Sequence, residues 1–168
     1  MNKGLLCLLI PLLLIPAKAA DDFLLVYPDL VTSCIKKPSA SMIEVNEKIM
    51  PWYLRGDFDG DGESDYAVAI RGKTTKRNGV LICDAKGRAF VLGADNPTRP
   101  PFSDLPGDNF VAENWVVFTR KEAVNLTKRQ QYAPRPFAVL GETIAMVFEN
   151  AIGIIYWDGR RYLWAPSR

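Results

Sequence analysis

The sequence predicts an α+β fold, a mainly antiparallel β-meander preceded by one N-terminal helix. Three observations favour this fold class. Apolar residues between positions 23 and 35 recur at three- and four-residue spacing, which is the period of an amphipathic helix. From residue 50 onward, short β-favouring runs alternate with turn-forming residues. Near the C-terminus, Asp158-Gly159 separates two such runs, as is typical of a hairpin.

The helix is expected within residues 21–37, where the apolar stripe consists of Phe23, Val26, Tyr27, Leu30, Val31, Cys34 and Ile35. Pro28 leaves two alternatives, because an interior proline breaks or kinks a helix. Either the helix is kinked at Pro28, or Pro28 is its first residue and the helix covers 28–36. Pro38 ends the helix in both cases. Residues 38–48 are polar and are expected to form a connector.

The pattern predicts seven or eight short strands, with β-favouring runs at residues 50–54, 66–70, 80–83, 89–92, 115–118, 143–148, 152–157 and 161–164. Asp158-Gly159 predicts a two-residue type I′ turn between the last two. Residues 94–109 contain four prolines and are expected to form a long loop, of a length that is often functional. Residues 120–132 are polar and basic, and the pattern leaves both a short helix and a surface loop open.

The first 19 residues have the pattern of an export signal. Lys3 precedes an apolar run at residues 4–16, and Ala17-Lys18-Ala19 is a small-residue cleavage site. We expect cleavage there, a single globular domain at residues 20–168, and a periplasmic or secreted protein. The alternative is an uncleaved anchor. No second hydrophobic segment follows, so the sequence predicts no stable membrane span after cleavage.

Composition excludes several classes of function. The chain carries 21 Lys and Arg against 19 Asp and Glu, and removal of Lys3 and Lys18 with the signal leaves a formally neutral protein. A neutral chain without a basic patch is not expected to bind nucleic acid. The sequence contains no histidine, which excludes His-based general acid–base catalysis, Ser-His-Asp and Cys-His nucleophiles, and zinc sites built on histidine.

Two cysteines remain after signal removal, Cys34 and Cys83. An even pair in an exported protein predicts one disulfide. Closing a loop of about 50 residues would stabilise the fold by about 4 kcal/mol in the chain-entropy model. The alternative is a pair of buried free thiols.

The strongest chemical signal is an acidic loop at residues 57–65. Asp57, Asp59, Asp61 and Asp65 occupy its positions 1, 3, 5 and 9, and Gly62 at position 6 permits a sharp turn. Converging carboxylates repel one another unless a cation lies between them. Ca²⁺ takes six to eight oxygen ligands, so we predict a calcium site with the four aspartates as ligands. Glu63, at position 7, would contribute its backbone carbonyl. Asp65 would bind directly or through a water molecule.

The spacing first suggests an EF-hand, but that motif needs a glutamate at position 12, where this chain has Val68, and helices on both sides. The stretch Gly56-Asp57-Phe58-Asp59-Gly60-Asp61-Gly62-Glu63-Ser64-Asp65, followed by Tyr66-Ala67-Val68-Ala69, instead resembles the calcium loop of FG-GAP and VCBS-type repeats of integrin-like β-propellers. The resemblance is local to residues 56–70. It implies calcium ligation by the matching aspartates between two strands. That family uses many copies and this chain has one, so the resemblance implies no propeller.

The predicted function is a small exported, calcium-stabilised, non-enzymatic binding or structural module with an unknown protein or glycan partner. Calcium is expected to brace the fold rather than to catalyse, because a catalytic metal needs an open position and usually a partner base. The alternative is an extracytoplasmic hydrolase acting on glycans, for which Glu142 and Glu149 are possible acids. A third alternative is an inhibitor or assembly partner that presents residues 94–109. The aromatic residues Tyr156, Trp157, Tyr162 and Trp164 are interpreted as core packing rather than as a sugar platform.

Overall fold

The computed structural model describes residues 27–94, 114–129, 139–148 and 151–166. Within these ranges the chain forms two antiparallel sheets and two α-helices. The first sheet contains β1 (Ile43–Val45), β2 (Tyr53–Gly56), β3 (Asp65–Gly72), β4 (Asn78–Cys83) and β5 (Ala89–Gly93). The second contains β6 (Asn114–Phe118), β7 (Thr143–Phe148), β8 (Ala151–Trp157) and β9 (Tyr162–Pro166). The helices are α1 (Asp29–Ile35) and α2 (Arg120–Arg129), and a short 3-10 helix, η1, covers Pro38–Ala40.

The prediction of a mainly antiparallel β protein is confirmed, and the second sheet is a meander in the order β6-β7-β8-β9. The first sheet differs from a simple meander. Strands β4 and β5 follow on one side of β3, while β2 and β1 both pair with its other side, β2 opposite Asp65–Val68 and β1 opposite Ile70–Gly72. Strand β1 falls within the region predicted as a connector. Its three residues are too few to show a period, so only pairing with β3 reveals it.

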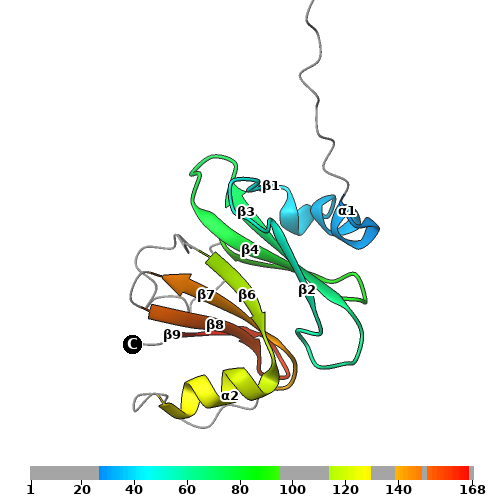
Figure 1. Cartoon of the computed structure of the whole chain (residues 1–168). Helices are drawn as coiled ribbons and strands as arrows, with labels where there is room; N and C mark the ends of the chain where they lie inside the picture. Colours follow the sequence, from blue (N-terminus) through cyan, green and yellow to red (C-terminus); the bar gives the residue numbers. More distant parts are fainter. Residues whose placement is uncertain (1–26, 95–113, 130–138, 149–150, 167–168) are drawn as a thin grey trace, which may run out of the picture.

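The two sheets pack face to face, which the sequence did not predict. Their shared core contains Leu54, Phe58, Ala67, Ala69, Val80, Ile82 and Leu92 from the first half and Trp115, Ile144, Met146, Ile155, Trp157, Tyr162 and Trp164 from the second. A second cluster lies between α1 and the outer face of the first sheet. A third cluster includes Ala123 of α2 with Ala145 and Ile154 of the second sheet. Figure 1 shows the resulting order of layers: α1, first sheet, second sheet, α2.

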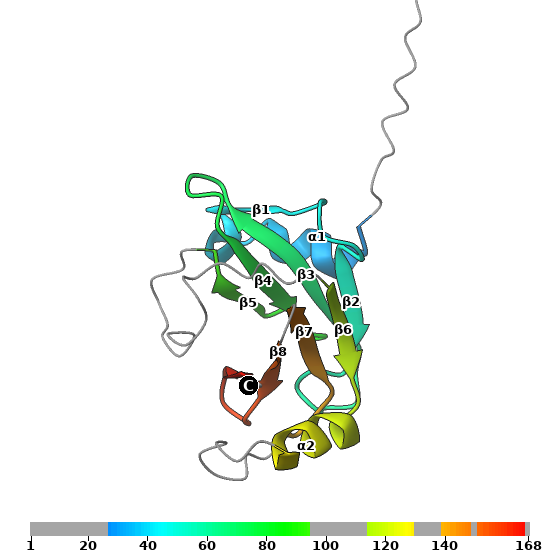
Figure 2. The same ribbon diagram turned by 60° about the vertical axis from the view of Figure 1, so that its left-hand side comes forward.

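The sheets also meet at one edge. Figure 2 shows β6 beside β2. The indole of Trp115 on β6 is 1% exposed, and its Nε1 donates to the carbonyl oxygen of Pro51 at 2.5 Å. Because Pro51 lies two residues before the start of β2, this bond ties the segment that leads into β2 to the second sheet.

The helix boundaries resolve two alternatives. Pro28 is the N-cap of α1, with a non-helical ψ of 143°, so the helix is not kinked there and begins one residue later than the predicted 28–36 helix, at Asp29. Proline suits this position because its missing N–H would have no partner in the first turn. Residues 120–129 form the helix rather than the loop. A capping box starts it: the amide of Thr119 donates to Glu122 Oε2 at 2.8 Å, and the amide of Glu122 donates to Thr119 Oγ1 at 3.3 Å.

The predicted two-residue turn at Asp158-Gly159 is wrong. Trp157 pairs with Tyr162, and four residues, 158–161, connect the strands. Asp158 Oδ1 accepts the amides of Arg160 and Arg161, both at 2.8 Å, and the amide of Asp158 donates to the carbonyl of Arg161 at 3.2 Å. The aspartate side chain therefore stabilises a wider turn than its Asp-Gly sequence suggests.

Cys34 on α1 and Cys83 at the end of β4 are both fully buried in the outer cluster. The predicted disulfide is not formed in this structure, in which both residues are free thiols. The thiols are neighbours, since the side-chain hydrogen bond between them is the main reason that the pKa of Cys34 is lowered and that of Cys83 is raised. The structure thus has the alternative of two buried thiols, and the bond stays a prediction for the exported protein.

The predicted signal at residues 1–19 and nearly all of the proline-rich segment 94–109 lie outside the described residues. Within the described ranges, no helix has the length and apolar character needed to cross a membrane.

Candidate metal site in the acidic loop

The acidic loop connects β2 to β3, so the predicted strand–loop–strand context is present. Gly56 at the end of β2 pairs with Asp65 at the start of β3. Between them the backbone coils tightly, and Gly60 and Gly62 adopt positive φ angles of 78° and 87°. These are conformations that residues with a Cβ rarely adopt. Two strand ends that are already paired therefore hold the loop closed.

Three of the predicted ligands converge. Carboxylate oxygens of Asp57, Asp59 and Asp61 lie within 4.8 Å of one another, and this group can hold a metal ion. Oxygen-only donors of this kind suit a hard cation. The like charges make the arrangement unfavourable without positive charge nearby.

Backbone amides orient Asp57 at the centre of the coil. Its Oδ1 accepts the amides of Gly60 at 2.8 Å and Asp61 at 3.0 Å, and its Oδ2 accepts the amide of Gly62 at 3.0 Å. Two further bonds fix the turn, from the Asp61 amide to Asp59 Oδ1 at 3.2 Å and from the Glu63 amide to Asp61 Oδ1 at 2.9 Å. The loop is thus organised by its own hydrogen bonds, and the three carboxylates are held close together before any ion binds.

Asp65 has a different position from the other three aspartates. It is fully buried and lies outside the converging group. Its Oδ2 accepts the amides of Phe58 at 2.8 Å and Asp59 at 3.2 Å, and its Oδ1 accepts the amide of Ala85 at 2.9 Å. Burial raises the pKa of Asp65 to about 6, although these amide bonds act in the opposite direction. In this structure Asp65 fastens the two ends of the loop together, and its role as a calcium ligand stays a prediction.

Glu63 is exposed, and its amide donates to Asp61 as described above. The predicted calcium ligand at this residue is its backbone carbonyl oxygen, so its side chain takes no part in the proposed coordination.

The turn between β4 and β5 supplies two cations that the sequence did not associate with the loop. Lys86 Nζ lies 2.7 Å from Asp61 Oδ2, and Arg88 Nη2 lies 3.1 Å from Asp59 Oδ2. The bond to Lys86 is the main reason that the pKa of Asp61 is lowered. The pKa of Asp59 is raised, mainly by burial and then by the charge of Asp61. The loop therefore already carries part of the positive charge that its carboxylates need.

The loop also docks on the second sheet. The Phe58 ring is 1% exposed within the core between the sheets. Glu142, just before β7, donates its amide to the carbonyl of Asp57 at 2.7 Å and accepts the Asp57 amide on Oε2 at 2.9 Å. A Cβ on Gly141 would lie 2.3 Å from the carbonyl oxygen of Asp57, so the two backbones touch here. The loop thus joins both sheets, and Glu142, a possible hydrolase acid, is part of this junction.

A buried hydroxyl lies near the loop. The ring of Tyr162 packs against those of Trp157 and Phe90, with distances between ring centres of 4.8 Å and 5.2 Å. Its hydroxyl has no hydrogen-bond partner among the described residues. The pKa of Tyr162 is raised, mainly by burial and then by the charges of Asp65, Asp59 and Asp84. The tyrosine hydroxyl therefore lies within electrostatic reach of the acidic loop.

The aromatic group is core, as predicted. Trp157, Tyr162 and Trp164 belong to the core between the sheets, and Tyr156 belongs to the cluster beneath α2. All four are at most 9% exposed, so they offer no stacking platform for a sugar. Glu149, the second possible hydrolase acid, lies outside the described residues.

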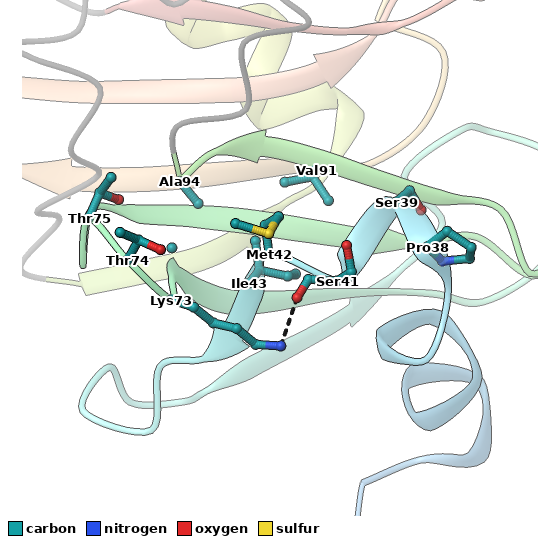
Figure 3. A pocket seen from close by; sticks show the side chains of 11 residues that line it. Pro38, Ser39, Ser41, Met42, Ile43, Lys73, Thr74, Thr75, Val91 and Ala94 are labelled. Atoms are coloured by element: carbon teal, nitrogen blue, oxygen red, sulfur yellow. Dashed lines mark hydrogen bonds between the residues drawn. The ribbon is translucent and has the colours of Figure 1, made fainter.

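A separate cavity of about 290 Å³ lies on the far side of the first sheet, beside η1 (Figure 3). It is lined by Pro38, Ser39, Ser41, Met42, Ile43, Gly72, Lys73, Thr74, Thr75, Val91 and Ala94. The ammonium of Lys73 donates to the carbonyl of Ser41 at 2.7 Å, the dashed line in Figure 3. The charged group of the lining is thus already engaged, and the residues named include no carboxylate.

No family model, no curated protein and no solved structure matches this chain.

Proposed function

We propose that this α+β chain is a small exported module whose acidic loop binds one Ca²⁺ ion and thereby stabilises the junction of its two sheets. The observation that carries the proposal is the convergence of the Asp57, Asp59 and Asp61 carboxylates on a loop whose Phe58 is part of the core. An ion bound there removes repulsion within the loop. Because the loop also bonds to Glu142, which directly precedes β7 of the second sheet, we expect this gain to stabilise the junction of the sheets.

Calcium is the proposed metal for reasons of ligand chemistry and loop size. Carboxylate and carbonyl oxygens suit hard cations, and Ca²⁺ tolerates the irregular, six- to eightfold coordination that a loop can provide. Mg²⁺ demands a near-ideal octahedron and gives up its waters reluctantly. The local resemblance to FG-GAP and VCBS-type loops supports the same ion. The predicted export signal at residues 1–19 is consistent with the same ion, since extracellular modules bind calcium with Kd values of about 10⁻⁴ to 10⁻³ M.

The role of the ion is proposed to be structural. Asp57 already accepts three backbone amides, and Asp59 and Asp61 are paired with cations, so these carboxylates hold the loop together. The biological function is then binding or assembly, with an unknown protein or glycan as partner. The hydrolase alternative requires two carboxylates that face one cleft. Glu142 is instead bonded to the amide of Asp57, which favours the non-enzymatic module.

The proposal is tested by thermal unfolding of the protein in 10 mM calcium and in chelator. At a Kd of about 10⁻⁴ to 10⁻³ M, 10 mM calcium is roughly a tenfold to hundredfold excess, which stabilises the native state by about 1.4 to 2.7 kcal/mol and raises Tm by several degrees. Asp61→Ala should abolish this rise. Glu44→Ala is the matched control, since both carboxylates hold a lysine ammonium, at 2.7 Å and 2.8 Å, and Glu44 lies outside the loop. Equal Tm values for the wild type in both solutions would contradict the proposal.

A further inference from the structure

The turn between β4 and β5 places two cations on the acidic loop in different ways. Arg88 is held from several sides. It is paired with Asp84, whose side chain is 1% exposed, and its guanidinium lies 5.5 Å from the centre of the Phe90 ring and 6.0 Å from that of Trp157. Its bond to Asp59 is therefore one of several contacts, and moving Arg88 would break all of them.

Lys86 is held by much less. Its side chain is 61% exposed, and its ammonium donates to Asp61 Oδ2 and, within the described ranges, to no second acceptor. Asp61 is itself partly exposed, with 22% of its side chain accessible. An exposed ion pair of this kind contributes little to stability and exchanges readily with solvent. Lys86 is therefore the cation that can leave the loop.

We propose that Lys86 is a built-in counter-ion that neutralises Asp61 when the loop is free of metal, is displaced when calcium binds, and thereby sets the calcium affinity of the loop. This inference rests on the proposed function. The Asp61 oxygens are both engaged in this structure, Oδ1 by the Glu63 amide and Oδ2 by Lys86. An ion among the three carboxylates must share Asp61 with the ammonium or displace it. Like charges at this distance repel, so calcium binding works against Lys86.

The two cations then have separate effects. Arg88 stays in place and offsets the charge of Asp59 in both states, because Asp84 and the aromatic rings hold it. Lys86 lowers repulsion in the metal-free loop and opposes the metal in the bound loop. The lysine therefore narrows the difference in free energy between the metal-free and the calcium-bound loop, which weakens calcium binding and stabilises the metal-free loop slightly.

The experiment compares Lys86→Met with Lys76→Met in the full mature chain. Lys76 is a close match for Lys86: its ammonium lies 2.8 Å from Glu44, its side chain is 58% exposed, and it lies in the β3–β4 turn of the same sheet. Methionine keeps the apolar stem and removes the charge. Calcium affinity is measured by isothermal titration with CaCl₂, and Tm is measured in chelator.

Lys86→Met should lower Kd for calcium by about threefold to tenfold, as expected for removing one charge at about 6 Å from a dication at moderate salt. The gain should shrink in 1 M KCl, where the screening length falls to about 3 Å. In chelator the Tm of Lys86→Met should fall below that of the wild type. Lys76→Met should leave the calcium Kd unchanged.

The outcomes separate the two proposals. A wild type that does not bind calcium contradicts the proposed function. A wild type that binds calcium, with the same Kd in Lys86→Met and Lys76→Met, leaves the proposed function standing and overturns the counter-ion inference. A Kd lowered equally in both variants also overturns it, since the effect would then reflect net charge rather than the position of Lys86.

Discussion

The acidic loop and the cysteine pair are the two regions predicted to stabilise the fold by a cross-link, one through a calcium ion and the other through a disulfide, and the structure places them differently. The loop lies at the junction of the sheets, where Phe58 packs in the shared core and Glu142 bonds to Asp57. The cysteines lie on the outer face, where α1 packs on the first sheet. The loop is held by many noncovalent contacts that the structure shows directly. The cysteine pair contributes packing as free thiols, and its further contribution depends on oxidation.

Among single substitutions in the loop, the largest loss of stability is expected from replacing its buried apolar residue, Phe58. Phe58→Ala should destabilise the protein by about 3–5 kcal/mol, because it leaves a cavity in the core between the sheets. Chemical denaturation measures this, in calcium and in chelator. Met42→Ala, at a side chain that is 66% exposed, is the control and should change stability by less than about 0.5 kcal/mol. A small loss for Phe58→Ala would show that the loop is only a surface feature.

The cysteine pair is expected to give an effect of similar size that depends on oxidation rather than on calcium. If the exported protein carries the Cys34–Cys83 bond, reduction should cost about 4 kcal/mol, from the entropy of a closed loop of about 50 residues. Denaturation of oxidised and reduced protein checks this, and Cys34→Ala with Cys83→Ala should make the two curves coincide. Mass spectrometry without reductant that finds two free thiols in the exported protein would refute the bond.

The structural role of the loop and its response to calcium can be tested separately by comparing Asp65 with Asp61. Asp65→Ala removes the acceptor of three amides and should cost about 3 kcal/mol with or without calcium. Asp61→Ala should change the stability of the metal-free protein little and abolish the response to calcium. Unfolding curves of both variants in the two solutions test this. An Asp65→Ala protein that is as stable as the wild type in chelator would contradict the structural role of Asp65.

A smaller effect is expected from pH. The pKa of Asp65 is raised from 3.8 to about 6 in the folded protein. The folded state therefore binds this proton more tightly than the unfolded state, so the stabilisation is complete below about pH 4 and is lost as pH rises through about 6. Between pH 7 and pH 5 the metal-free protein should gain about 1 kcal/mol from this group. Titration of the Asp65 carboxyl carbon by NMR checks the assignment, and a midpoint below 4 would contradict it.

The sequence predicted the elements whose signal is local. Residues 66–70 and 143–148 are β-favouring runs, and both lie within observed strands, β3 and β7. The spacing of Asp57, Asp59 and Asp61 likewise predicted that their carboxylates converge. Thr119 and Glu122 have the spacing of a capping box, so the start of α2 is also encoded locally.

The rest depends on contacts between distant residues. Strand β1 is defined by its pairing with residues 70–72 of β3, where Glu44 lies opposite Arg71 and pairs with it at 2.7 Å. Asp65 has the same side chain as the other aspartates of the loop, and its burial and its bond from the distant amide of Ala85 depend on contacts outside the loop. Glu142 and Lys86 reach the loop from other parts of the chain, so no spacing within residues 57–65 could predict them. Likewise, the alternation of apolar and polar residues along one strand does not show which sheet will pack against it.

Hydrogen exchange with and without calcium tests most directly the claim that the loop joins the two sheets. Calcium should slow exchange at amides of the loop and also at the Glu142 amide and in β7 of the second sheet, because Glu142 bonds to Asp57 on both its amide and its carboxylate. Amides of α2, on the far side of the second sheet, should change least. Slower exchange confined to residues 57–65 would contradict the account.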